Sequence, residues 1–225
     1  MTGTVPIVIM KFGAREHMED FRKNGTLHMS PLKTFREIEE SHKMHLRKDV
    51  YEGADHFYQG NQIQIKINTP EGKEIILDSS NGLLHARIGY NSTLEIKVFC
   101  MYAVKLDGSH PYIHEDNFNF GDTAAIITDL GKFIDRLMEA AKKNNYRLQA
   151  RLVEYFDENQ YHGEMGIFRK PKAFSYQSEY RIALNVPGTD PIKLCIGDLS
   201  DICVLCDLQK INSLIEVDYP LQESV

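Results

Sequence analysis

Several features that would assign a function at once are missing from this 225-residue sequence. No stretch reaches eighteen uninterrupted apolar residues, so nothing predicts a membrane-spanning helix. The first ten residues carry no basic cluster and are too short for a secretory signal, which leads us to expect a cytoplasmic protein. An excess of basic charge is missing too, because the net charge is −6 at pH 7. This balance argues against tight, sequence-independent binding to duplex DNA.

Common catalytic signatures are also absent. The chain has no GxSxG nucleophile elbow, no P-loop and no GxGxxG dinucleotide fingerprint. None of the four cysteines is adjacent to a histidine in the sequence, so no Cys-His nucleophile is indicated. Cys203 and Cys206 have the CxxC spacing of zinc knuckles, but they lie in an apolar, strand-like run without turn residues. We interpret them as structural thiols, which behave as small hydrophobic side chains when buried.

The composition and the residue patterns predict a folded α+β domain. The chain is 42% hydrophobic and 26% charged, which is enough for a core and ordinary for a globular protein. Residues 61–104 have the alternating and apolar runs that are typical of strands. Three helices are expected, over about 14–24, from Ser30 onward and over about 128–144. We therefore expect a single domain spanning 1–225, with a mostly antiparallel sheet and about three helices.

The most informative segment is 174–184. It has the aromatic and aliphatic content of a strand, but Gln177, Glu179 and Arg181 recur in it at a spacing of two. Residues at this spacing in a strand point to the same side, so the three side chains would form one polar row. A carboxylate fixed beside an amide can accept a hydrogen bond from a substrate hydroxyl and stabilise positive charge at a sugar carbon. Alternatively, the row is the solvated face of an edge strand, with ordinary surface charges.

A second candidate lies in residues 41–60, where no strand or helix period is visible. The guanidinium of Arg47 suits a phosphate or a carboxylate because it offers a planar fork of donors. A salt-linked loop that binds nothing would explain Arg47, Asp49 and Glu52 equally well. The histidines of this segment lack the spacing of helical metal ligands, so we predict no metal site. The compact acids Asp49, Glu52 and Asp55 still leave a metal-dependent nuclease open.

Short motifs along most of the chain resemble a widespread bacterial domain of unknown function. Its members begin with a Lys-Phe strand and a helix, matched here by Lys11 and Phe12. A G-x-L-x-x-S/P-x-x-F element follows, which Gly25 to Ser30 and then Phe35 resemble, and a late F-x-x-Q-x-E-x-R strand is matched by residues 174–181. This resemblance implies a related fold and names no activity.

The Gln177-x-Glu179 pair is also similar to the Q/E-x-E pair on a late strand of many ADP-ribosyltransferases. The resemblance implies an ADP-ribosyltransferase-like fold and NAD as the cofactor. It further implies that Glu179 orients the nicotinamide-side ribose and that Gln177 helps to select the acceptor. The basic or histidine residue on the first strand of that family is matched by Lys11 or His28, or is replaced by Arg47. The Ser-Thr-Ser strand of the family has no counterpart about forty residues before Gln177.

Together these observations lead to the hypothesis of an NAD-dependent ADP-ribosyltransferase-like enzyme, a bacterial or phage toxin or phage-defence effector. Its acceptor would be a protein or a single-stranded nucleic acid, and an antitoxin or another partner protein could bind it. The alternative is a non-enzymatic protein-interaction module of a bacterial defence system. In the enzyme, the 41–60 segment and the Glu179 segment would meet across one cleft. The predicted catalytic residues are Glu179 and Gln177, and the predicted cofactor-binding residues are Arg47 (pyrophosphate), Tyr51 or Tyr58 (stacking on nicotinamide), Asp49 and Arg181.

Overall fold

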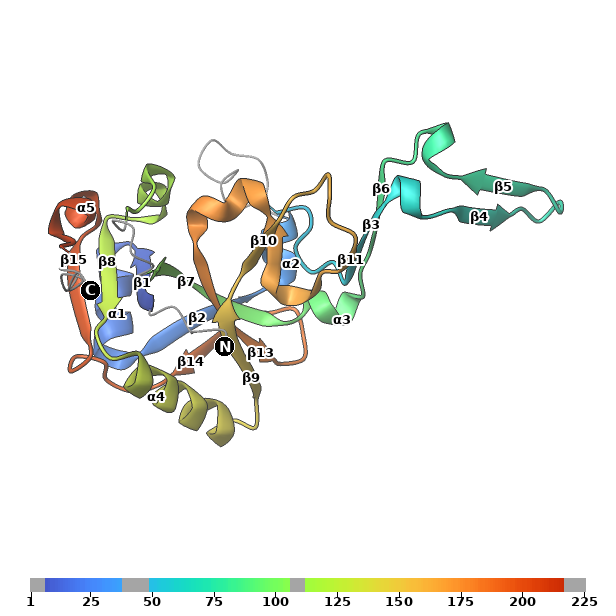
Figure 1. The fold of residues 1–225 in the computed structure, drawn as a ribbon. Helices are drawn as coiled ribbons and strands as arrows, with labels where there is room; N and C mark the ends of the chain where they lie inside the picture. Colours follow the sequence, from blue (N-terminus) through green and yellow to red (C-terminus); the bar gives the residue numbers. More distant parts are fainter. Residues whose placement is uncertain (1–6, 38–48, 106–111, 217–225) are drawn as a thin grey trace, which may run out of the picture.

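The computed structural model describes residues 7–37, 49–105 and 112–216 (Figure 1). These residues form a mixed α+β structure whose strand pairs are antiparallel except for one parallel pair, β10 with β12. The strands are β1 (Ile7–Gly13), β2 (Thr26–Pro31), β3 (His56–Gln59), β4 (Ile65–Asn68), β5 (Glu74–Leu77), β6 (His85–Ile88), β7 (Lys97–Lys105), β8 (Thr123–Ile127), β9 (Arg147–Leu152), β10 (Glu154–Phe156), β11 (Gly163–Glu164), β12 (Arg169–Pro171), β13 (Glu179–Asn185), β14 (Ile192–Cys195) and β15 (Cys203–Asp207). The α-helices are α1 (Arg15–Asn24), α2 (Leu32–Glu37), α3 (Asn91–Leu94), α4 (Leu130–Lys143) and α5 (Ile211–Leu214).

Strand β7 lies at the centre of the main sheet. One of its edges pairs with β13, which in turn pairs with β9. Two different strands share the other edge: residues 7–10 of β1 pair with 102–105, and residues 30–31 of β2 pair with 97–98. β1 then continues onto β8, which pairs with β15, while β2 pairs with β14. The sheet is therefore split on this edge of β7, around residues 99–101.

The main hydrophobic core lies where helices α1 and α4 cover the sheet (Figure 1). Phe21 of α1 stacks on Phe99 of β7, with ring centroids 5.7 Å apart, and also contacts Phe133 of α4. α1 ends at Gly25, whose φ of 60° suits glycine and whose amide donates to the carbonyl of Phe21. This cap turns the chain directly from α1 into β2. It thereby fixes β2 beside the split in the sheet.

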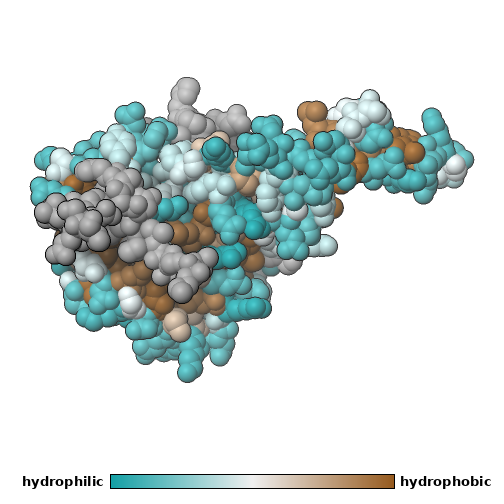
Figure 2. Space-filling view, viewed as in Figure 1, coloured by the Kyte–Doolittle hydropathy of each residue, from teal (hydrophilic) through white to brown (hydrophobic). Residues whose placement is uncertain are grey.

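A long ribbon made of residues 56–88 extends away from this body (Figure 1). At its root, β3 pairs with β6 and β11, and Phe57 packs against Phe156 in a small separate core. Beyond the root, β4 and β5 form a two-stranded hairpin in which Ile67 lies opposite Ile75. These two side chains are 45% and 38% exposed, and Figure 2 shows hydrophobic atoms on the surface of the ribbon. The ribbon therefore presents apolar side chains that the body does not cover.

Several local expectations are confirmed. The predicted helix near 128–144 is α4, the strand-like runs of residues 61–104 include the paired strands β4 and β5, and the CxxC run lies in strand β15. In the described part of the chain, no helix is both long and apolar enough to cross a membrane.

Candidate functional site

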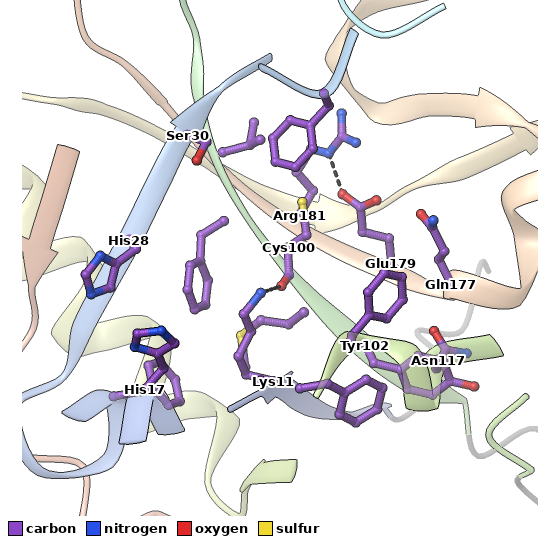
Figure 3. A pocket seen from close by; sticks show the side chains of 18 of the residues that line it. Lys11, His17, His28, Ser30, Cys100, Tyr102, Asn117, Gln177, Glu179 and Arg181 are labelled. Carbon is purple, nitrogen blue, oxygen red and sulfur yellow. Dashed lines mark hydrogen bonds and ion pairs between the residues drawn. The ribbon is translucent and has the colours of Figure 1, made fainter. Parts of the chain in front are cut away.

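A cavity of about 590 Å³ lies where the main sheet is split (Figure 3). Its walls come from β1, β2 and the first turns of α1 on one side, and from β7 and the start of β13 on the other. The volume is within the range of small-molecule sites, about 300–1,000 Å³. The polar and charged residues that line it include Lys11, His17, His28, Ser30, Asn117, Lys170, Gln177, Glu179 and Arg181.

Lys11 lies in the break between the strands. Its Nζ donates to the carbonyl oxygen of Cys100 at 2.7 Å and lies 4.6 Å from the centroid of the Phe99 ring. The amide of Ala103 in β7 donates to the carbonyl of Ser178, just before β13. In an antiparallel strand the backbone groups of successive residues point to opposite edges. The amide and carbonyl of Cys100, three residues earlier, therefore point to the other edge, where β1 and β2 have diverged. A lysine side chain thus takes the place of the missing strand partner and puts a cation at the middle of the cavity.

A buried ion cluster closes one end of the cavity. Arg181 Nε donates to Glu179 Oε1 at 2.6 Å, and its Nη1 and Nη2 donate to the two oxygens of Glu52 at 2.7 and 3.1 Å. Lys170 Nζ lies 3.0 Å from Glu179 Oε2 and 3.8 Å from Glu52 Oε2. Each of these four residues is at most 6% exposed. Two cations and two carboxylates therefore balance each other where they are largely shielded from water.

This cluster keeps Glu179 ionised. Burial alone would raise the pKa of Glu179, but Arg181 and Lys170 outweigh it and hold the pKa well below its usual value. Burial likewise disfavours the charged form of Lys170, yet Glu179 and Glu52 raise its pKa. Glu179 is consequently an acceptor of hydrogen bonds, and not a proton donor, throughout the physiological pH range.

Asp49 lies next to the cluster and behaves in the opposite way. It is 1% exposed, and its Oδ1 accepts a hydrogen bond from the amide of Tyr51 at 2.9 Å. Within the described residues its Oδ2 has no hydrogen-bond partner. Burial and the nearby Glu52 raise the pKa of Asp49 to about 7, against the effects of Lys170 and Arg181. Asp49 therefore exchanges a proton near neutral pH, although it is not among the residues that line the cavity.

The expectation of one continuous strand through Gln177 is wrong. β13 begins at Glu179, whereas Gln177 ends a 3₁₀ helix, Lys172–Gln177. Between them Ser178 has a φ of 38°, in the left-handed region, and its Oγ donates to the carbonyl of Ala103 at 2.6 Å. The alternative of a solvated edge strand is also wrong, since β13 lies between β7 and β9 and its Glu179 and Arg181 are buried.

Gln177 still reaches the cavity, by a different route from the expected one. Lys170 Nζ donates to its Oε1 at 2.8 Å, which ties the amide to the ion cluster. The cavity thus brings Gln177, Glu179 and Arg181 together, as Figure 3 shows. The predicted meeting with the 41–60 segment is made by Glu52.

The remaining predicted residues lie elsewhere. Tyr51 contacts Phe57 and Phe156 at the root of the ribbon, and Tyr58 contacts His56 and His162. Neither tyrosine is among the residues that line the cavity. Its aromatic lining is Phe12, Phe21, Phe35, Phe99, Tyr102 and Phe120. Arg47, together with His42 and His45, lies outside the described residues.

The sequence patterns do not mark Lys170, His17 or Tyr102 as residues of a site. Lys170 was visible only as part of a basic dipeptide before a proline, and its burial depends on Glu52 and Glu179, which are distant in the sequence. His17 resembles any polar residue on the exposed face of a helix. Tyr102 lies in the apolar run of β7, where an aromatic residue is typical of the hydrophobic core and not of a ligand site.

Among the described residues, no group of three or more histidine, cysteine, aspartate or glutamate side chains is placed to hold a metal ion. No protein-family model, no curated protein and no solved structure matches the chain.

Proposed function

We propose that the chain is an ADP-ribosyltransferase-like enzyme that binds NAD in the cavity at the split of the main sheet. The observation that carries the proposal is Glu179, a carboxylate held ionised at the end of a cavity of about 590 Å³. In this proposal Glu179 accepts a hydrogen bond from a hydroxyl of the nicotinamide-side ribose. A split antiparallel sheet with a carboxylate at the start of an inner strand is compatible with an ADP-ribosyltransferase-like fold.

The ion pairs define what Glu179 contributes. Arg181 and Lys170 each approach one of its oxygens. Together with Glu52 the cluster contains two cations and two carboxylates, so as a whole it carries no net charge. Each carboxylate oxygen has more than one acceptor site, which leaves capacity for a ribose hydroxyl. Arg181 and Lys170 then fix the position of the carboxylate. Glu179 in turn orients the sugar and lies nearest to the positive charge that develops at the sugar carbon.

Other residues of the cavity support the same ligand. NAD supplies the ADP-ribosyl group when its bond to nicotinamide is broken. Lys11 offers a cation to the pyrophosphate, and the ring of Tyr102 offers an apolar wall to a flat base. Gln177 lies beside Glu179 at the same end of the cavity and is placed to contact the acceptor (Figure 3).

The test is NAD consumption by the wild type and by Glu179→Gln, with a protein mixture and single-stranded nucleic acid as acceptors. Loss of this carboxylate is expected to slow turnover by about 10²–10³-fold. Glu139→Gln, at an exposed position of α4, is the matched control and retains full turnover. Because Glu179 also pairs with buried cations, circular dichroism must show that the variant is folded. If Glu179→Gln does not fold, Gln177→Ala, which leaves the four charges in place, replaces it. No turnover by the wild type with any acceptor, or equal turnover in both proteins, overturns the proposal.

A second candidate function is a non-enzymatic protein-interaction module. The exposed Ile67 and Ile75 on the ribbon favour it, because apolar side chains on a projecting hairpin are typical of a contact surface. This candidate predicts that Glu179→Gln retains partner binding and phenotype, whereas an Ile67→Lys/Ile75→Lys variant loses both. An expression-toxicity assay of the two variants separates the candidates.

A further inference from the structure

We propose that His17 and His28 form the phosphate-binding end of this cavity, so that the ligand is a nucleotide lying with its phosphates toward α1. The inference deepens the proposed function and rests on it, since it assigns a direction to the ligand in the same site. It begins from an asymmetry in charge between the two ends of the cavity.

The end at Glu179 is unsuited to a phosphate. Glu179 is held ionised there, and the two cations of the cluster, Arg181 and Lys170, are already engaged in hydrogen bonds and ion pairs with Glu179 and Glu52. A phosphate at this end would approach Glu179 and Glu52 without a free cation to offset the repulsion. Neutral hydroxyl groups, which can donate to Glu179, fit this end better.

The opposite end has the complementary character. His17, from the first turns of α1, and His28, from β2, both line the cavity, and their ring centroids lie 6.1 Å apart. Their side chains are 63% and 51% exposed, so a ligand can reach them. Figure 3 shows the two imidazoles across the cavity from Glu179, and the side chain of Lys11 lies between the imidazoles and Glu179. Two imidazoles and a lysine ammonium lining the same part of the cavity suit the charges of a pyrophosphate.

The charged neighbours of the two rings leave them available. His17 Nε2 lies 3.8 Å from Glu16 Oε1, and His28 Nε2 lies 3.8 Å from Asp20 Oδ2. At this distance neither contact is a hydrogen bond, so these carboxylates do not engage the two ring nitrogens. On the adjacent strand β14, Lys193 lies directly opposite His28 and adds a further cation.

The experiment measures the affinity of the full-length protein for ADP, inorganic pyrophosphate and adenosine by calorimetry. We expect the wild type to bind ADP at least about tenfold more tightly than adenosine, because hydrogen bonds to a charged phosphate add to the contacts of the base. In a His17→Gln/His28→Gln variant, the affinity for ADP should fall about tenfold while that for adenosine is unchanged. His162→Gln, at the root of the ribbon, is the control and binds like the wild type.

Each outcome bears on the inference. Equal affinity for ADP in the wild type and the double variant overturns the assignment of the histidines, and so does ADP binding no tighter than adenosine. If pyrophosphate binds as tightly as ADP and adenosine does not bind, the claim that the ligand is a nucleotide is overturned and the cavity is only an anion site. Histidine-dependent binding of ADP without any NAD turnover supports the inference and contradicts the proposed enzyme. NAD turnover together with ADP binding that does not depend on the histidines supports the proposed enzyme and contradicts the inference.

Discussion

The buried ion cluster makes Arg181 a position where one substitution should cost much stability. Arg181 is 1% exposed and donates to Glu179 and to both oxygens of Glu52. Methionine would retain much of its volume but would leave two buried carboxylates with Lys170 as their cation. Removing one partner of a buried ion pair costs about 3–5 kcal/mol. We expect Arg181→Met to lose about this much of the free energy of unfolding, which is a large part of the roughly 5–15 kcal/mol of a typical domain.

The loss should depend on pH in a defined direction. In the wild type, the folded-state pKa of Glu179 lies below its unfolded value, so its ionised form stabilises the fold. That contribution is fully present above the unfolded pKa, near 4.3, and disappears as the pH falls through the folded pKa. In Arg181→Met, Lys170 alone offsets the burial of both carboxylates, so ionisation of Glu179 stabilises the fold less than in the wild type as the pH rises. The difference between the two proteins is therefore smallest near pH 4 and grows toward pH 7.

Urea unfolding followed by circular dichroism, from pH 4 to pH 7.5, measures both effects. Arg181→Lys keeps the charge but loses the planar fork, so its loss should lie between those of the wild type and Arg181→Met. Arg136→Met is the control, since Arg136 pairs with Asp201 at the surface and such pairs contribute about 0–1 kcal/mol. A loss in Arg181→Met no larger than in the control, or a loss that is greatest at low pH, would refute the reasoning.

Three further predictions concern stability. Burial raises the folded pKa of Asp49 to about 7, above its unfolded value, so its ionisation costs the folded protein stability as the pH rises between the two values. In urea titrations Asp49→Asn should therefore stabilise the protein by roughly 2–4 kcal/mol at pH 8 and by little at pH 4. Replacing residues 63–82 by a short turn should change the thermal midpoint little, since no described core cluster includes any of them, and a drop of more than about 8 °C would contradict this. Gly25→Ala should destabilise more than Gly72→Ala in the same urea assay: both glycines have positive φ, but only at Gly25 would the added Cβ lie 2.1 Å from the carbonyl oxygen of Gly197. Equal losses in these two variants would show that the clash does not matter.

Local patterns were sufficient for the elements whose signals lie within a few residues. At the start of α4, within the predicted helix, Asp129 caps the first turn by accepting a hydrogen bond from the amide of Lys132 at 3.0 Å. The alternation before and after the turn near Gly72 corresponds to the paired strands β4 and β5. In both cases the residues that determine the conformation are neighbours in the sequence, so the pattern contains the physical cause.

The candidate site was only partly predictable, because its causes are distant in the sequence. The run from Phe174 to Arg181 has the composition of a strand, but Ser178 adopts a left-handed conformation that is stabilised by its bond to Ala103. Glu179 and Arg181 are charged residues of the types usually found on a solvent-exposed surface. They are buried because Glu52 and Lys170 supply opposite charges from other parts of the chain. No local pattern can reveal such a pairing.

The split that forms the cavity has a similar origin. Met10 pairs with both Tyr102 of β7 and Ile126 of β8, and beyond it β1 follows β8 alone. β2 joins β7 only at its last two residues, so the backbone edge at Cys100 has no strand opposite it, and the ammonium of Lys11 satisfies its carbonyl instead. A ligand that draws the ammonium of Lys11 away from the carbonyl of Cys100 must supply another hydrogen-bond donor to it, since a buried carbonyl without a partner costs free energy. The cavity therefore favours a ligand that binds the ammonium while leaving its bond to Cys100 in place, as an anion approaching from the side of His17 would.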